Sequence, residues 1–263
     1  MSETLELARE MAASDHDKAA IKYYERVLFF DKHKAYTGQI YTELADIYQR
    51  AGNTKAALSY LNSAFYLSET PESQLQIQFR QISLYLLAQD FLGANEELFD
   101  IDLDATMDSS YAEAKGFYLG ITYFGLEQYD SAWKYFYAYT DGQTEATQEL
   151  DKLFKRNARI SKIAPRKAKL MSTFLPGLGQ VYYGDLKNGL NSFLLTTGLV
   201  GLGIHLSSTI SPLDAAFTVI PWFIRYYQGG IKRSGEIAQQ KRQRKRAEVY
   251  QEILTVLSTT RAK

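Results

Sequence analysis

The stretch Glu43–Leu67, "ELADIYQRAGNTKAALSYLNSAFYL", contains two helical patterns on either side of a glycine. Small and bulky apolar residues recur three or four positions apart before and after Gly52, which is the spacing of one helix face. In the second half, Ala57, Leu61 and Ala64 share such a face. The stretch therefore predicts two helices joined by a tight turn, with small residues that allow close approach.

The same pattern recurs through the first half of the chain. Four alanines can be aligned at spacings of 37, 37 and 38 residues: Ala20, Ala57, Ala94 and Ala132. A bulky residue follows each alanine four positions later, and a tyrosine precedes three of them by nine positions: Tyr48, Tyr85 and Tyr123. One such helix pair cannot bury its apolar face alone. The recurrence therefore predicts stacked helical repeats, with these seven residues in the packing between helices.

These positions resemble the tetratricopeptide repeat (TPR) family over residues 3–142. The positions that fall on the family's pattern in the best copy are Leu44, Ala45, Tyr48, Gly52, Ala57, Leu61 and Ala64. The family's period is 34 residues, so the helices or turns here are extended. The resemblance implies a right-handed superhelix whose concave groove binds an extended peptide or a partner helix. The aromatic residues are expected to fill the core between repeats, and the alternative is that some of them line the groove as peptide contacts.

The charges divide unevenly although the formal net charge is zero. Residues 1–142 carry 11 Lys/Arg and 22 Asp/Glu, whereas residues 143–263 carry 19 and 8. Such asymmetry predicts two different environments or partners. Asp141-Gly142 is a turn signal at this boundary. The chain has no cysteine, which excludes disulfides, thiol catalysis and cysteine-bound zinc.

Residues 143–171 are predicted to form a basic helical connector. Residues 145–163 read as an amphipathic helix that could cap the repeats. Basic side chains recur from Lys152 to Lys169, with Asp151 as the one acid beside them. They are expected to lie either on a solvated helix face or opposite phosphates of lipid or nucleic acid.

The run Thr173–Gly184, "TFLPGLGQVYYG", is not a nucleotide-binding loop. A Walker loop needs Gly-Lys-Ser/Thr, but Gly184 is followed by Asp185 and Leu186. The dinucleotide fingerprint needs a third glycine three positions after Gly179, where Tyr182 stands. No nucleotide cofactor is therefore expected.

Two apolar stretches follow and predict a membrane hairpin over residues 172–230. Residues 189–206 have no Asp, Glu, Lys or Arg and approach the roughly 20 residues that a spanning helix needs. Residues 213–227 have an uncharged centre of only ten residues and include Pro221, which is expected to kink the helix. Gly229-Gly230 is expected to end this segment. The alternative is a hairpin packed inside a soluble helical protein.

The start of this region resembles the small bacterial two-transmembrane-helix domain. The residues that match its Pro-Gly-x-Gly-Gln-x-Tyr-x-Gly motif and the glycine after it are Pro176, Gly177, Gly179, Gln180, Tyr182, Gly184 and Gly189. Repeats fused to such a domain are similar to bacterial cell-envelope proteins, which commonly carry a secretory signal. The repeats would face the cytoplasm by the positive-inside rule if Met1 is native, and the periplasm if a signal peptide was removed.

Residues 231–263 are predicted to form a basic juxtamembrane helix. Five basic residues are expected to contact anionic lipid: Lys241, Arg242, Arg244, Lys245 and Arg246. An apolar helical pattern follows, and a plain solvated helix is the alternative.

The sequence thus predicts an all-α protein with a TPR-like solenoid over residues 1–142, the connector, the hairpin and the basic helix. Its three histidines, His16, His33 and His205, are scattered and match no catalytic signature. We expect no catalytic, cofactor or metal residues. The expected function is that of a non-enzymatic, membrane-anchored adaptor or scaffold that binds protein or peptide partners in the bacterial envelope. The alternative is a soluble repeat protein whose basic end binds nucleic acid, a partner that the sequence favours less than lipid.

Overall fold

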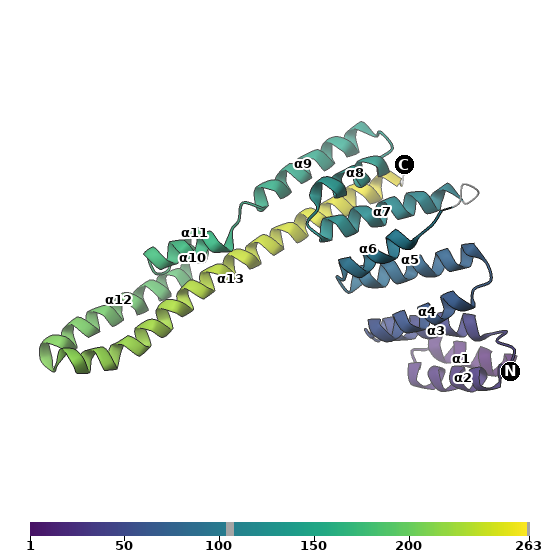
Figure 1. Ribbon diagram of the computed structural model, residues 1–263, viewed down its shortest axis with the longest axis horizontal. Coiled ribbons are helices and arrows are strands. Elements are labelled where there is room, and N and C mark those ends of the chain that lie inside the picture. Colours follow the sequence, from purple (N-terminus) through teal and green to yellow (C-terminus); the bar gives the residue numbers. More distant parts are fainter. Residues whose placement is uncertain (104–107, 262–263) are drawn as a thin grey trace. The chain divides into compact units, whose positions relative to one another are not determined.

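The computed structural model describes residues 1–103 and 108–261 (Figure 1). These residues form helices joined by turns, and they contain no strands. The predicted all-α class is therefore confirmed for those residues. The chain divides into two compact units, Met1–Gly142 and Gln143–Lys263. Residues 104–107 of the predicted repeat region and residues 262–263 of the predicted basic helix lie outside the described residues.

The first unit consists of helices that each pack against the next along the chain. In its described part these are α1 (Ser2–Ala13), α2 (Asp17–Phe30), α3 (Thr37–Arg50), α4 (Thr54–Leu67), α5 (Pro71–Leu87), α6 (Phe91–Asp100), α7 (Ser109–Gly125) and α8 (Tyr129–Tyr139).

One turn geometry recurs between the two helices of each pair. A residue in the left-handed conformation stands in each of these turns: Asp15, Gly52, Gln89 and Glu127. The amide of the residue after it then bonds to a carbonyl five residues back, for example from Asn53 to Tyr48 at 2.8 Å. This is the hydrogen bond of a Schellman C-cap. The turns are 37, 37 and 38 residues apart, which is the spacing of the aligned alanines.

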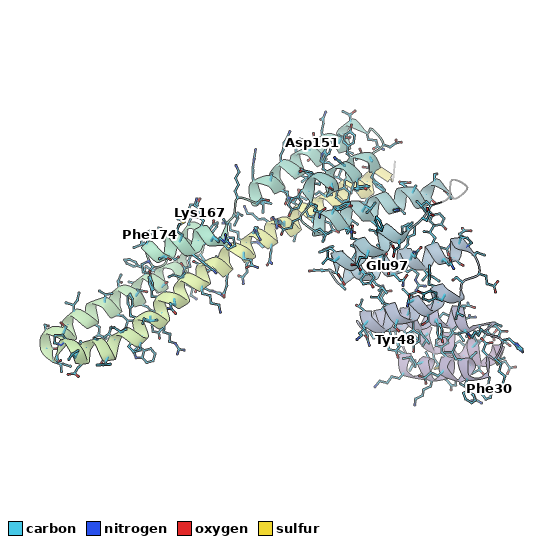
Figure 2. All side chains as sticks on the ribbon, in the orientation of Figure 1. Phe30, Tyr48, Glu97, Asp151, Lys167 and Phe174 are labelled. Atoms are coloured by element: carbon cyan, nitrogen blue, oxygen red, sulfur yellow. The ribbon has the colours of Figure 1, made fainter. Side chains whose placement is uncertain are left out.

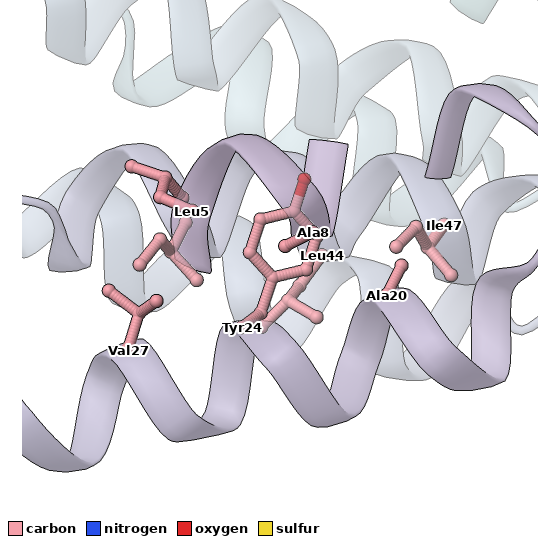
Figure 3. Packing of buried hydrophobic residues seen from close by; sticks show 8 residues of the cluster. Leu5, Ala8, Ala20, Tyr24, Val27, Leu44 and Ile47 are labelled. Carbon is pink, nitrogen blue, oxygen red and sulfur yellow. The ribbon is translucent and has the colours of Figure 1, made fainter. Parts of the chain in front are cut away.

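In the first unit, the described core clusters each join one helix pair to the first helix of the next pair. The cluster in Figure 3 contains Leu5 and Ala8 from α1, three residues from α2, and Leu44 and Ile47 from α3. A second cluster links α3 and α4 to α5. Because these contacts cross from one pair to the next, no pair buries its apolar face by itself.

Asp31 holds the connection between α2 and α3. Asp31 is buried, with 6% of the residue exposed. It accepts hydrogen bonds from the Ala35 and Tyr36 amides at 2.9 and 2.8 Å and from Thr37 Oγ1 at 2.9 Å. Burial by itself would raise the pKa of Asp31, but the hydrogen bonds from Tyr36, Thr37 and Ala35 outweigh it and lower that pKa.

We expect Asp31→Asn to lower the free energy of unfolding by about 1–2 kcal/mol at pH 7, because bonds to a charged acceptor are lost. The pKa of Asp31 is lower in the folded state than the roughly 3.9 of an unfolded aspartate. Its stabilisation is thus present above about pH 4 and is lost as pH falls through the folded pKa. The free energy of unfolding is measured by denaturant titration of the full chain in mild detergent, followed by Trp133 fluorescence in a Trp222→Phe background. It should fall at acid pH in the chain with Asp31, and this fall should be missing in Asp31→Asn. The exposed Asp102→Asn should behave as the wild type, and an Asp31→Asn chain that keeps the wild-type acid dependence would contradict the assignment.

The second unit is built along one long helix. Its elements are α9 (Thr144–Ile160), α10 (Pro165–Phe174), α11 (Leu178–Tyr182), α12 (Leu186–Thr209) and α13 (Pro212–Arg261). Helix α12 packs against the first part of α13 as a hairpin, and α9 and α10 pack against later parts of α13 (Figure 1). The short α11 contacts α10, α12 and α13.

The helix that contains the second apolar segment continues past Gly229-Gly230, so these glycines do not break it. Both glycines lie inside α13, which continues without interruption through Pro221 to Arg261. A glycine costs about 1 kcal/mol in a helix relative to alanine, but Gly230 has a packing reason. A Cβ there would lie 2.3 Å from Ser192 Oγ of α12, so the two helices approach closely at this point.

Candidate functional site: the base of the α12–α13 hairpin

The predicted repeat-packing alanines are all buried. Ala20, Ala57, Ala94 and Ala132 have no exposed surface. The bulky residues four positions later are also at most 1% exposed: Tyr24, Leu61, Leu98 and Phe136. The alanine therefore lets the neighbouring helix approach, and the larger residue one turn later fills the space beside it.

The three predicted tyrosines are half-buried between the helices of a pair. Tyr48, labelled in Figure 2, stacks on Tyr60 with ring centroids 5.4 Å apart, and Tyr123 stacks on Tyr135 at 5.6 Å. The third differs, because Tyr85 packs over Gly93, where a Cβ would meet its ring at 2.6 Å. Burial is the main cause that raises the pKa of Tyr85, and the nearby Glu97 adds to it.

A polar row joins the first helices of successive pairs at a nearly constant separation. Arg9 of α1 pairs with Glu43 of α3 at 2.8 Å, and Asp46 of α3 pairs with Arg80 of α5. Ser83 of α5 shares a hydrogen bond of 3.0 Å with the Tyr118 hydroxyl of α7. These partners are 34 or 35 residues apart. Beside the row lies a hollow of about 420 Å³, lined by residues that include Lys34, Gln39, Thr42, Gln76 and Arg80.

In the second unit, the predicted hairpin motif forms the junction between α10, α11 and α12. Pro176 and Gly177 make the turn before α11, and Gly177 has a φ of 87°. A Cβ on Gly177 would lie 2.1 Å from the Gly189 carbonyl oxygen, and one on Gly189 would lie 2.5 Å from Val181 Cγ2. The glycines therefore allow the backbones of α11 and α12 to touch.

Gln180 connects this junction to α13. Its side chain is 1% exposed. Its Oε1 accepts from Ser172 Oγ at 2.9 Å, and its Nε2 donates to the Gly230 carbonyl at 2.9 Å. Ser172 Oγ also accepts from the Gly179 amide at 3.0 Å, where a Cβ on Gly179 would lie 2.2 Å from the Ala168 carbonyl oxygen. The polar groups of this buried glutamine thus hold α10, α11 and α13 in one arrangement.

The remaining motif residues lie at the edge of the junction. Tyr182 is 55% exposed, and the Lys167 ammonium lies 4.9 Å from its ring centroid. Lys167 and the exposed Phe174 mark this side of α10 in Figure 2. Gly184 has a φ of 93° and ends the turn after α11. The ammonium and the ring therefore form a cation–π contact at the exposed edge of the junction.

Asp185 caps the start of α12. Its carboxylate accepts from the Asn188 amide at 3.0 Å and from Asn188 Nδ2 at 2.7 Å. These bonds, with the Asn188 side chain first, lower the pKa of Asp185, and the charges of Arg233 and Lys187 lower it further. The carboxylate is therefore ionised at neutral pH and is occupied by the helix terminus.

The five predicted lipid-contact residues differ in their contacts and in their exposure. Lys241 Nζ donates to the Tyr183 carbonyl at 2.9 Å, beside α11. Arg246 lies toward α9, with a nitrogen 3.4 Å from Ser161 Oγ, and Arg242 is half-buried. Arg244 and Lys245 are exposed. Two of the five are therefore exposed, and three are partly buried.

Helix α12 carries an apolar surface that the protein itself does not cover. Among the described residues, α12 is the one helix long and apolar enough to cross a membrane by length and composition, and only 17% of its most apolar window is buried. Exposed side chains occur along its whole length and on the facing part of α13: Leu186, Leu190, Leu194, Val200, Leu202, Ile204, Phe217, Ile220, Trp222 and Ile224. The core helix of a soluble protein would instead be mostly buried.

Several residues of this site were not singled out in the sequence. Ser172 completes the hydrogen bonds of Gln180, and Lys187 and Arg233 lie beside Asp185 in the fold. Gly230 was noticed as the end of a segment and not as a hydrogen-bond partner of Gln180, and Ser172 gives no signal of its own. Among the described residues no group of three or more His, Asp or Glu side chains could hold a metal ion.

Comparison of the chain with protein-family models, with curated proteins and with solved structures found no match.

Proposed function

We propose that the protein is a non-enzymatic adaptor anchored in a bacterial membrane by the α12–α13 hairpin. The observation that carries this proposal is the uncovered apolar surface of α12, which runs for 24 residues from a rigid polar base. At 1.5 Å per residue α12 is about 36 Å long, enough to cross a hydrocarbon layer of about 30 Å.

The continuity of α13 supports a second crossing. A Cβ on Gly230 would lie 2.3 Å from Ser192 Oγ, so residue 230 of α13 lies beside the second turn of α12. Residues 212–230 give 19 residues, or about 28 Å, opposite α12. Within them Asp214 and Arg225 are the acidic and basic residues. Both lie within a few turns of an end, where a long side chain such as that of arginine can reach the interface.

The first unit is proposed to be a TPR-like solenoid that binds a protein or peptide partner. The recurrent turn, the buried alanines and the polar row at 34–35 residues support this assignment. The hollow beside Gln39, Gln76 and Arg80 offers amide and guanidinium donors to the backbone and carboxylates of an extended segment. By the positive-inside rule, the end of the hairpin that carries the lysine and arginine residues faces the cytoplasm.

Leu194→Arg tests the anchor. Leu194 is 58% exposed near the middle of the apolar surface, and an arginine in the centre of a spanning helix costs about 2.5–3.5 kcal/mol on insertion scales. We expect the full-length wild type to remain in the membrane pellet after an alkaline carbonate wash and Leu194→Arg to leave it in large part. Leu92→Arg is the matched control, because Leu92 is 66% exposed on α6 of the other unit and should leave retention unchanged.

A second readout measures insertion directly. The chain has two tryptophans, so Trp133→Phe leaves Trp222, which is 52% exposed on α13, as the single reporter. Brominated lipids should quench its fluorescence. A wild-type chain that washes off the membrane and whose Trp222 is not quenched would overturn the anchor. Salt-sensitive RNA binding by that chain would then support the nucleic-acid alternative.

A further inference from the structure

A hollow of about 710 Å³ lies at the base of the hairpin, outside the contacts that hold the motif together. It is bounded on one side by the turn from α11 into α12 and on the other by α13. The lining residues that bear on its chemistry are Gly184, Asp185, Lys187, Arg233, Lys241 and Arg244. Its volume is within the range of about 300–1,000 Å³ typical of small-ligand sites.

The charge of the hollow is strongly positive. Four cations line it, and the one lining acid is Asp185, whose oxygens are taken by Asn188. Arg233 and Arg244 each form an exposed pair with a glutamate of their own helix, at 3.4 and 3.8 Å. Such exposed pairs contribute little and are easily exchanged for another anion. The hollow therefore offers two guanidinium groups and two ammonium groups to an anion that is not part of the chain.

Lys241 is held in place for such a contact. Its Nζ donates to the Tyr183 carbonyl at 2.9 Å, which uses one of its three donors. Gly184 stands beside it, and a Cβ at that position would lie 3.6 Å from Nζ. The glycine therefore leaves the ammonium uncovered on the side of the hollow.

An apolar stripe begins where the hollow ends. Leu186 lines the hollow and is 68% exposed. Leu190 and Leu194 follow it at intervals of four residues and are each 58% exposed, so the three leucines share one face of α12. A cationic hollow above a stripe of leucines fits a molecule with an anionic head and an acyl chain, and a free phosphate would use only the hollow.

We propose that this hollow binds the phosphate group of an anionic membrane lipid, whose acyl chain lies along Leu186, Leu190 and Leu194. Lys187, Arg233, Lys241 and Arg244 hold the phosphate oxygens by charge-assisted hydrogen bonds. The inference rests on the proposed membrane insertion, and it adds a defined lipid site to it.

The test is a comparison of two double variants with equal loss of charge. Lys187→Gln with Arg244→Gln removes two exposed cations of the hollow. Lys232→Gln with Arg26→Gln removes two exposed cations outside the hollow, one on α13 and one on α2. The full-length chains, in neutral detergent, are titrated with fluorescent phosphatidylglycerol and, separately, with fluorescent phosphatidylcholine. We expect the first variant to bind phosphatidylglycerol about 10–30-fold more weakly than the wild type, and the control to change less than about threefold.

Competition experiments distinguish a lipid phosphate from free phosphate and from the phosphates of RNA. Inorganic phosphate at millimolar concentration should not displace the fluorescent lipid, and a short RNA should not displace it more effectively than unlabelled phosphatidylglycerol does. Displacement by either, or equal loss of affinity in the two double variants, would overturn the lipid site. Trp222 quenching by brominated zwitterionic lipid should persist in both variants, so loss of the site is separable from loss of insertion. A wild-type chain that fails to insert would overturn both proposals.

Discussion

Gly177→Ala should destabilise the junction of α10, α11 and α12 by about 3–5 kcal/mol. Two separate costs add at this position. Gly177 has a φ of 87°, where a residue with a Cβ is strained. The new Cβ would also lie 2.1 Å from the Gly189 carbonyl oxygen, and a backbone atom cannot move away as the end of a flexible side chain can. We expect α11 to separate from α12 and the Gln180 bonds to open.

Hydrogen exchange of the full chain in detergent measures this effect locally. Amides of residues 175–189 should exchange at least about 100-fold faster in Gly177→Ala, since each 1.4 kcal/mol is a factor of ten. Gly198→Ala is the matched control. No heavy atom lies within 4 Å of a Cβ there, and the position is inside α12, so alanine should stabilise the helix by up to about 1 kcal/mol. Wild-type exchange in Gly177→Ala would contradict the contact between Gly177 and Gly189.

The all-α class was predictable because helical periodicity and small residues at fixed offsets are local signals. The recurrent turn was not predictable, even though it recurs with the same period as the aligned alanines. Only Gly52 among its four left-handed residues is a glycine, whereas Asp15, Gln89 and Glu127 adopt this conformation without a glycine signal. The Schellman bond across each turn offsets that cost, and such a bond appears only when the helix end is in place.

The continuation of α13 through Gly229-Gly230 was hidden for a related reason. Gly229-Gly230 reads as a breaker when only local propensity is considered. In the fold, Gly230 receives the Gln180 side chain on its carbonyl and Ser192 close to its Cα, so tertiary packing overrides propensity. The cationic hollow was equally hidden, because Lys187 and Lys241 are 54 positions apart in sequence and meet only through the hairpin.

Phe136→Ala should lower the free energy of unfolding of the first unit by about 3–5 kcal/mol, because it leaves a large cavity in a fully buried position. The geometry makes a sharper prediction for its neighbour on α7. A Cβ on Gly120 would lie 2.5 Å from Phe136 Cε1. Gly120→Ala should therefore destabilise the wild type by about 1–3 kcal/mol, because the ring is already packed against the backbone.

In the Phe136→Ala background the same change should reverse its sign. The methyl group then occupies part of the vacated space, and alanine favours the helix over glycine, so Gly120→Ala should stabilise by about 1 kcal/mol. Denaturant unfolding, followed by Trp133 fluorescence in the Trp222→Phe background, gives the unfolding free energy of the four proteins of this double-mutant cycle. They are the wild type, the two single variants and the double variant. Gly116→Ala on the same helix is the control, since no heavy atom lies within 4 Å of its Cβ, and it should give the same small stabilisation in both backgrounds. Additive effects of Gly120→Ala and Phe136→Ala would show that α7 and α8 do not meet at these residues, and the pairing of helices around the aligned alanine Ala132 would have to be revised.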